Sequence, residues 1–499
     1  MEPPQLAPNA CVACKTKKRR CDKILPKCSL CLRNWRVCDY SLISAATTSA
    51  SHTESASSIL GKHRLSISDC DGLLPGYVSE QLGDEATQRA ISSRYFQVTH
   101  NWLPIISRQR FSRHLDAPTE TWPSDCKLLL LCMKLINWLP DASNPQTPLY
   151  RAAKRFFLEV ELSGVVSLAV LQAAILIAFY ELGHGIYPLA YISVGICVRY
   201  GAALSIEPRS TTSANALPAS WIKEEERTRI WWTLLLLDRL VFSMPQFGLR
   251  DADSVYLQSF ICLIQPTQPL SIQEAKSEHI LPSDDKLWDY GASDPWQQAT
   301  VASPCKLQHP RFSLVAQATV LLDRVLSRTH PKGKANMSEE ETLQLQRTIE
   351  AMVEFTRVEC PARHLFRVFG CEVKAILFGS LIALHDEDDF SIPVSLNIPL
   401  LIGSELAAIA WEASLQENDI SRDQWPPFAV HIIYQGAVSI VKSKRDAGYE
   451  AVQLCLQPFK SALEIAQQRW LSAGKQSSVS SFHSIIVPVC HFGIVWALD

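Results

Sequence analysis

Residues 11–40, CVACKTKKRRCDKILPKCSLCLRNWRVCDY, place six cysteines in two halves that repeat the spacing Cys-x2-Cys-x6-Cys. The six are Cys11, Cys14, Cys21, Cys28, Cys31 and Cys38. A segment this short cannot build an adequate apolar core. We therefore expect metal binding to supply most of its folding free energy.

The number of cysteines limits how metal can be bound. Zinc prefers four thiolates in a tetrahedron, and each Cys-x2-Cys pair can hold one ion. One ion would leave two cysteines unused, and two separate ions would need eight thiolates where the module has six. The count closes if two cysteines bridge both ions, and the symmetric candidates are Cys11 and Cys28. Two zinc ions per chain are predicted, one completed by Cys14 and Cys21, the other by Cys31 and Cys38.

The positive charge of the chain is concentrated in the same region. Residues 1–40 carry nine Lys or Arg and three acidic residues, so the rest must total −8 to give the net charge of −2. Five of the basic residues lie in 15–20, KTKKRR, between two predicted metal ligands. A basic module on an acidic body indicates that the module binds a polyanion.

Other uses of these cysteines are less consistent with the sequence. A disulfide framework needs an oxidising compartment, and the first ten residues lack a secretory signal. A redox Cys-x2-Cys needs a βαβ context that is not visible. A zinc module that binds protein is the main alternative, and the basic run argues against it. The ten other cysteines, scattered from Cys70 to Cys490, are expected to be reduced and mostly buried.

Residues 11–40 resemble the fungal binuclear zinc-cluster (Zn2Cys6) DNA-binding domain over its whole length, including Pro26 before the fourth cysteine. In that family a short helix after the first Cys-x2-Cys presents its end to the major groove. The resemblance implies that Lys17 and Lys18 contact guanine edges in a CGG-type triplet of double-stranded DNA. The other basic residues would neutralise phosphates. These are Lys15, Arg19, Arg20, Lys23 and Lys27.

The expected organisation has four parts. Residues 1–10 form a flexible arm, 11–40 the DNA-binding domain, 41–83 a linker, and 84–499 an all-α regulatory region. Ser, Thr or Ala occupies 14 of the 18 positions in 41–58, which is linker composition. Apolar residues recur at helical spacing in the body. Helices are predicted at 85–103, 125–139, 147–163, 165–183, 187–205, 221–244, 312–329, 338–358, 363–385, 395–416, 428–443, 450–472 and 481–497.

The expected fold is thus a small Zn2Cys6 module followed by a large all-α domain. A second resemblance, to the fungal-specific transcription factor domain, covers about 88–255. It depends on RYF (94–96), HNWLPI (100–105), EERTRIWW (225–232) and DR (238–239), with Thr228 as a departure. Trp231 and Trp232 are expected to pack inside the bundle rather than contact an effector. Ser220 is the expected cap of this helix, and Glu225 pairs with Arg229 one turn later.

No Gly-x-Ser-x-Gly, P-loop, Gly-x-Gly-x-x-Gly or His-Glu-x-x-His motif is present, so no enzymatic activity is expected. His184, between two glycines, is interpreted as a helix-end residue. The acidic stretch 386–389 is interpreted as a solvated helix end, with part of an activation surface as the alternative. Residues 284–290, DDKLWDY, mix acids and aromatics as activation segments do. An activation segment is the less favoured interpretation of this stretch. The longest apolar run, 165–180, is short for a membrane-spanning helix, so no membrane partner is expected.

These features predict a nuclear, sequence-specific regulator of RNA polymerase II genes that acts with co-regulators or the transcription machinery. A zinc-dependent protein–protein adaptor and an enzyme with a metal-binding appendage are the alternatives. Leu60, Ile67 and Leu74 stand seven residues apart but span only two heptads, with poor helix formers between them. Residues 1–80 are therefore predicted to be monomeric, and any homodimer would depend on the body.

Overall fold

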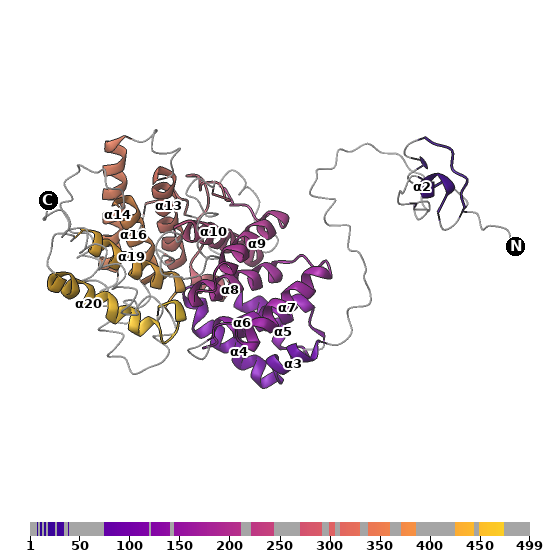
Figure 1. Ribbon diagram of the computed structural model, residues 1–499, viewed down its shortest axis with the longest axis horizontal. Coiled ribbons are helices and arrows are strands. Elements are labelled where there is room, and N and C mark those ends of the chain that lie inside the picture. Colours follow the sequence, from indigo (N-terminus) through magenta and orange to yellow (C-terminus); the bar gives the residue numbers. More distant parts are fainter. Residues whose placement is uncertain are drawn as a thin grey trace, which may run out of the picture. The chain divides into compact units, whose positions relative to one another are not determined.

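The computed structural model divides into two compact units, residues 1–66 and 67–499, and each is considered by itself (Figure 1). In the first unit the structure describes residues 7, 10, 11, 14, 15, 18–24, 27–33 and 38. In the second it describes residues 74–118, 121–139, 144–210, 221–243, 270–291, 299–304, 310–329, 338–359, 371–385, 425–443 and 449–473.

The second unit is helical, and its described part contains no strand beyond two isolated antiparallel bridges. Its helices in chain order are α3 (Gly76–Leu82), α4 (Glu85–Gln97), η2 (Thr99–Asn101), α5 (Arg108–Leu115), α6 (Ser124–Ile136), α7 (Pro148–Leu162), α8 (Leu168–His184), α9 (Leu189–Ala203), α10 (Trp221–Ser243), α12 (Asp285–Asp289), α13 (Arg311–Thr329), α14 (Glu339–Glu359), α16 (Cys371–His385), α19 (Pro427–Ser443) and α20 (Tyr449–Ala466). Within the described residues, no helix is long and apolar enough to cross a membrane.

Helix α8 lies at the centre of this unit (Figure 1). All of its residues from 170 to 184 are buried, as expected of a helix that is apolar on every side. The Ser167 side chain accepts a hydrogen bond from the Val170 N–H at its start, and Gly185 closes it with a left-handed φ of 62°. His184 is therefore the last residue of a helix, as predicted, and it is fully buried.

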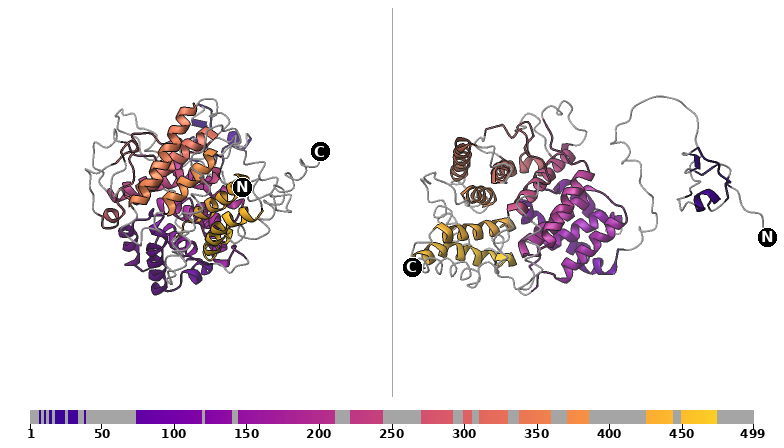
Figure 2. Two further views of the ribbon diagram at one scale, coloured as in Figure 1. Left: turned by 90° about the vertical axis from the view of Figure 1, so that its left-hand side faces the viewer. Right: turned by 45° about the horizontal axis from the view of Figure 1, so that its top comes forward.

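The remaining helices pack around α8 in two directions. Among the helices of the N-terminal half of the body, α6, α7 and α9 contact α8 directly, and α3 and α4 pack on α6. Helix α10 contacts both α9 and α13. Helices α13 and α14 pack on α16, α16 packs on α19, and α19 packs on α20. Helix α19 also contacts α8, so the C-terminal helices return to the N-terminal ones (Figure 2). Trp470, a few residues after the end of α20, packs on Gly183 of α8.

The body begins earlier than the sequence indicated. Helix α3 falls within the range expected to be linker, 41–83. It belongs to the body instead, because Val78 and Leu82 are fully buried in the core. Helices α5 and α12 were also not predicted; each is short, and one turn of apolar residues gives little periodicity. The other predicted helices match the described ones to within a few residues, although residues 363–370 of the predicted helix 363–385 lie outside the described residues. The predicted helices 395–416 and 481–497, Ser220 and the acidic stretch 386–389 also lie outside them.

Candidate metal centre and nucleic-acid interface

The two halves of the cysteine module start with the same backbone turn. The Lys15 N–H donates to the Cys11 carbonyl at 2.9 Å, and the Leu32 N–H donates to the Cys28 carbonyl at 2.9 Å. The second turn continues as α2 (Ser29–Arg33). Asp22 caps it, because both carboxylate oxygens accept from the Ser29 N–H at 3.1 and 3.2 Å. A hydrogen bond with the Ser29 side chain, together with the Ser29 N–H, lowers the pKa of the Asp22 carboxyl.

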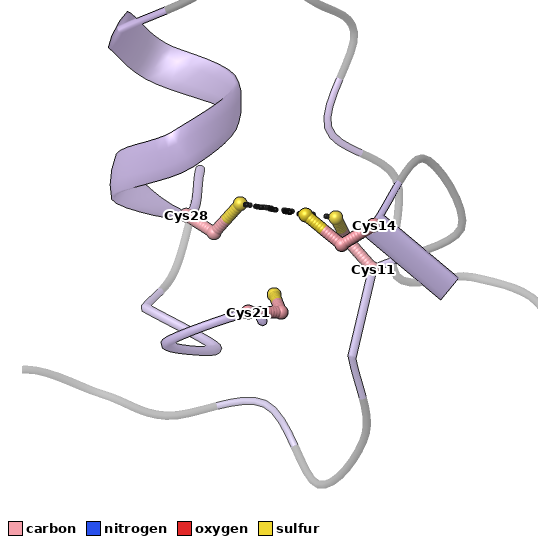
Figure 3. A group of neighbouring side chains, drawn as sticks. All are labelled: Cys11, Cys14, Cys21 and Cys28. Atoms are coloured by element: carbon pink, nitrogen blue, oxygen red, sulfur yellow. Dashed lines mark hydrogen bonds between the residues drawn. The ribbon is translucent and has the colours of Figure 1, made fainter. Parts of the chain in front are cut away.

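The turns bring the cysteine sulfurs together. The Cys11 Sγ lies 3.8 Å from the Cys28 Sγ and 3.7 Å from the Cys31 Sγ. The Cys14 Sγ lies 3.8 Å from the Cys28 Sγ (Figure 3). A tetrahedron with Zn–S bonds of about 2.3 Å has edges of about 3.8 Å. The spacing of these sulfurs therefore fits ligands of one metal ion.

The sulfurs form two groups of four that share two members. One group is Cys11, Cys14, Cys21 and Cys28, and the other is Cys11, Cys28, Cys31 and Cys38. Within each group all sulfurs lie within 4.8 Å of one another. Backbone N–H groups of Cys28 and Cys31 also point at sulfurs of the second group, at 3.3 and 3.4 Å. The shared members are the two cysteines that the symmetry argument selected.

Another grouping is also compatible with these distances. Cys14 Sγ and Cys31 Sγ lie 3.9 Å apart, although the two-ion arrangement assigns them to different ions. Two tetrahedra that share an edge would hold such sulfurs about 5 Å apart. One ion held by Cys11, Cys14, Cys28 and Cys31 is thus the arrangement that a metal count must exclude.

The donor set fits zinc. Burial raises the pKa of the Cys11 and Cys14 thiols, and that of the Cys28 thiol to about 12. Buried thiols of this kind keep their protons unless a cation compensates the thiolate charge. Four soft sulfur donors in tetrahedral spacing favour zinc over calcium or magnesium, which prefer oxygen.

The basic side chains near the cysteines face solvent. Lys15, Lys18, Arg19, Arg20 and Lys27 are exposed, and Lys23 is half-buried. Lys17, the other predicted base contact, lies outside the described residues.

Lys18 has a φ of 48°, in the left-handed region. Its N–H donates to the Lys15 carbonyl at 3.1 Å, and the Arg19 N–H donates to the Cys14 carbonyl at 2.9 Å. This pair of bonds is a Schellman motif, with Lys18 at the position where glycine is usual.

Lys23 is a second lysine with a positive φ, of 62°. Its carbonyl accepts a hydrogen bond from the Ala7 N–H at 2.8 Å, and Ala7 is 5% exposed. The arm expected to be flexible over residues 1–10 is therefore attached to the module at Ala7. Composition could not reveal this, because one backbone hydrogen bond makes the attachment.

In the body, Glu225 and Arg229 of the α10 motif connect this helix to α12. The predicted Glu225–Arg229 pair is present at 2.8 Å, and Arg229 also reaches Asp285 at 2.6 Å. The Arg229 guanidinium lies 4.1 Å from the ring centroid of Trp288, which is fully buried. Trp288 belongs to 284–290, the stretch that mixes acids and aromatics as activation segments do. Trp288 itself is packed inside the body, whereas Tyr290 in the same stretch is 84% exposed.

The Trp-Trp and Asp-Arg pairs of the α10 motif also make contacts inside the body. Trp231 and Trp232 are 5% and 2% exposed, as predicted. Arg239 donates to Asp323 on α13 at 2.6 Å. Asp238 accepts from the backbone N–H of Ile272 at 3.1 Å. The Asp-Arg pair therefore connects α10 to α13 and to the segment before α12, a role that sequence spacing did not indicate.

Comparison with known families supports both resemblances. Residues 9–46 match the family model described as the fungal Zn(2)-Cys(6) binuclear cluster domain. Residues 92–245 match the model of the fungal specific transcription factor domain.

Two curated proteins are similar to parts of the chain. Transcription factor BOA15 of Botryotinia fuckeliana is 40% identical over 137 residues, which cover 27% of this chain and 76% of that protein. The depudecin biosynthesis cluster-specific transcription activator DEP6 of Alternaria brassicicola is 28% identical over 118 residues. That match covers 24% of this chain and only 18% of the activator's length.

Proposed function

We propose a function for this chain from its family: it belongs to the fungal Zn2Cys6 transcription factors that carry a fungal-specific transcription factor domain, and it is a transcription regulator. In the proposed function it acts in the nucleus on RNA polymerase II genes, by binding CGG-type triplets in double-stranded DNA. The helical body would contact co-regulators or the transcription machinery. No catalytic step is part of this function.

The observation that carries the proposal is the pair of four-sulfur groups that share Cys11 and Cys28. In the proposed centre these two cysteines bridge two zinc ions, and the other four cysteines each bind one. Six thiolates and two Zn²⁺ leave a formal charge of −2, which the surrounding basic residues exceed. The loaded module then remains cationic and suited to a polyanion.

The basic residues have two proposed roles. Lys17 and Lys18 donate to guanine O6 and N7 and so read sequence. The phosphate contacts fix the register without reading bases. They are Lys15, Arg19, Arg20, Lys23 and Lys27.

The test is the affinity of the zinc-loaded chain for matched duplexes with and without a CGG triplet, over a salt series. Five phosphate contacts predict that log K falls with log[salt] with a slope of about −4 to −5. The triplet should improve affinity at every salt concentration. Binding that ignores the triplet, or no binding, would favour the zinc-dependent protein–protein adaptor instead.

A further inference from the structure

Helix α9 is apolar on almost every side, yet the described residues leave one of its sides uncovered. Its 15 residues include one charged side chain, Arg199, and no acidic residue. A helix of this composition is normally enclosed by the protein core. Ala190, Val194 and Cys197 are buried, as expected, but Ile192 is 47% exposed. The outward side of α9 is therefore a candidate for contact with another molecule.

Helix α7 lies beside α9, and two hydrogen bonds join them. The Lys154 Nζ donates to the Ser193 Oγ at 3.1 Å, and the Tyr200 hydroxyl donates to the Glu161 carboxylate at 3.2 Å. From the first bond to the second, the chain advances from 154 to 161 on α7 and from 193 to 200 on α9. The two helices therefore run parallel here, and positions one turn from these contacts flank the line along which they meet.

Apolar side chains flank this line on both helices. On α7, Leu158 and Leu162 are one turn apart and are 53% and 85% exposed. On α9, Ile192 and Ile196 are also one turn apart, and Ile196 is half-buried. We name these four residues the α7–α9 face. Exposed apolar residues gathered on one surface are typical of an interaction site rather than of free surface.

The charge around the α7–α9 face is opposite to that of the body. Residues 41–499 total −8, whereas α7 and α9 together carry four basic residues and two acidic ones, a total of +2. Two of the basic residues pair with glutamates of the same unit. The other two, Arg151 and Arg199, are exposed and form no ion pair within the described part of the chain. They remain available to a carboxylate from outside.

The two available arginines lie at opposite ends of the α7–α9 face. Arg151 precedes Leu158 by about two turns, and Arg199 follows Ile192 by about two turns, so each shares the outer side of its helix. Because position 154 lies beside 193, position 151 is level with about 190. Arg199 is then about nine residues, or ~13 Å, further along the face. A partner that matches this arrangement is apolar in the middle and anionic at both ends.

We propose that the α7–α9 face binds an acidic amphipathic helix of a co-regulator. The apolar side of that helix covers the leucines and isoleucines, as in other complexes where an amphipathic helix lies on an apolar surface. Its carboxylates at the two ends of this side pair with Arg151 and Arg199. The partner rests on the proposed function, in which the body contacts co-regulators, and it names the surface that makes the contact.

The surroundings of the face favour a single helix over larger partners. Residues 41–499 total −8, so an anionic membrane or a second acidic body would meet repulsive charge around the face. A single helix contacts the face alone, and exposed charges more than about 8 Å away are largely screened at physiological salt. A DNA backbone offers no apolar side to cover the leucines.

The first experiment measures binding of a fluorescent synthetic peptide to the zinc-loaded full chain by anisotropy. The peptide is a helix of about 18 residues, with leucines along one side and glutamates at both ends of that side. Wild type should bind it, and Leu158→Glu should raise the dissociation constant roughly tenfold or more. Leu454→Glu is the matched control and should bind as wild type, since Leu454 on α20 is 77% exposed and lies outside the face.

The second experiment exchanges the charges. A second peptide carries lysines in place of the glutamates, and wild type should bind it more weakly than the acidic peptide. Arg199→Glu should weaken the acidic peptide and improve the lysine peptide, because the sign of one end contact is reversed. Arg113→Glu, at an exposed position of α5, removes the same charge outside the face and should change neither affinity appreciably. A contact without charge recognition would respond equally to both peptides.

Four outcomes would overturn the proposal. They are no binding of the acidic peptide, no preference for it over the lysine peptide, insensitivity to Leu158→Glu, and self-association of wild type that Leu158→Glu abolishes. The last would assign the face to a second copy of the chain. Wild type and Leu158→Glu should bind a CGG duplex equally. A chain that prefers CGG but ignores the acidic peptide would refute this inference alone, and one that binds the peptide without preferring CGG would refute only the proposed DNA recognition.

Discussion

The left-handed conformation of Lys18 allows its backbone and its charge to be tested separately. A residue with a Cβ costs roughly 1–2 kcal/mol in this region. Glycine avoids that cost but loses about 0.5–1 kcal/mol more in conformational entropy on folding. Lys18→Gly should therefore stabilise the module by about 0.5–1 kcal/mol, which is about a two- to fivefold change in an equilibrium constant. Lys18→Ala keeps the Cβ and should bring no such gain.

Both variants remove the same ammonium group. If Lys18 contacts a guanine edge, each should lose about 1–3 kcal/mol on the CGG duplex and discriminate less among triplets. Two measurements are made on each variant. Competition for zinc with a chromogenic chelator measures the stability of the zinc-loaded module, and titration of matched duplexes measures its affinity for DNA with and without the CGG triplet. Lys18→Gly is then expected to hold zinc more tightly while it binds DNA more weakly.

Lys23 is the matched control, because it is also a lysine at positive φ. Lys23→Gly should show the same gain in zinc retention. If Lys23 meets only phosphate, however, the variant should weaken all duplexes equally and reduce the salt slope by about one. Equal zinc retention by Lys18→Gly and Lys18→Ala would refute the backbone argument. An equal loss on both duplexes would make Lys18 a phosphate contact.

The structure supports three further predictions. Cys28→Ala should lose both zinc ions and Cys38→Ala mainly weaken one, as metal analysis of the purified variants would show; a wild-type count near one ion would reject the bridged centre. A fragment of residues 1–80 should sediment as a monomer at micromolar concentration, and a stable dimer of it would contradict a dimer held by the body. Gly183→Ala should lower the thermal midpoint, because the new methyl overlaps the tryptophan ring packed on α8, at a cost of about 1–3 kcal/mol. Gly195→Ala, with open space around it, should instead be neutral or stabilising, and equal effects of the two would refute the packing argument.

Features set by local spacing could be predicted from the sequence. The cysteine ligands follow from the number of thiolates that zinc requires, and α8 follows from a run that is apolar on every side. The burial of Trp231 and Trp232 follows from their place on an apolar helix. Each of these arguments uses residues close together in the chain.

Features set by distant contacts could not be predicted in this way. Helix α12 is only five residues long, and Arg229, more than fifty positions earlier, holds it by an ion pair to Asp285. Composition placed α3 in the linker, although contacts with α6 and α7 fix it to the body. The positive φ of Lys18 had no signal either, because glycine is the residue that usually marks such a turn.

The matching backbone turns at Cys11 and Cys28 make the cysteine module an internal repeat with an offset of seventeen residues. Cys-Asp recurs at that offset, at 21–22 and 38–39. The exposed side chains of the two halves differ. Where the first half exposes Lys15, the second exposes Leu32, 63% accessible, at the equivalent position. The same backbone turn therefore presents a charge in one half and an apolar side chain in the other, and Leu32→Lys would give both halves a basic residue at this position.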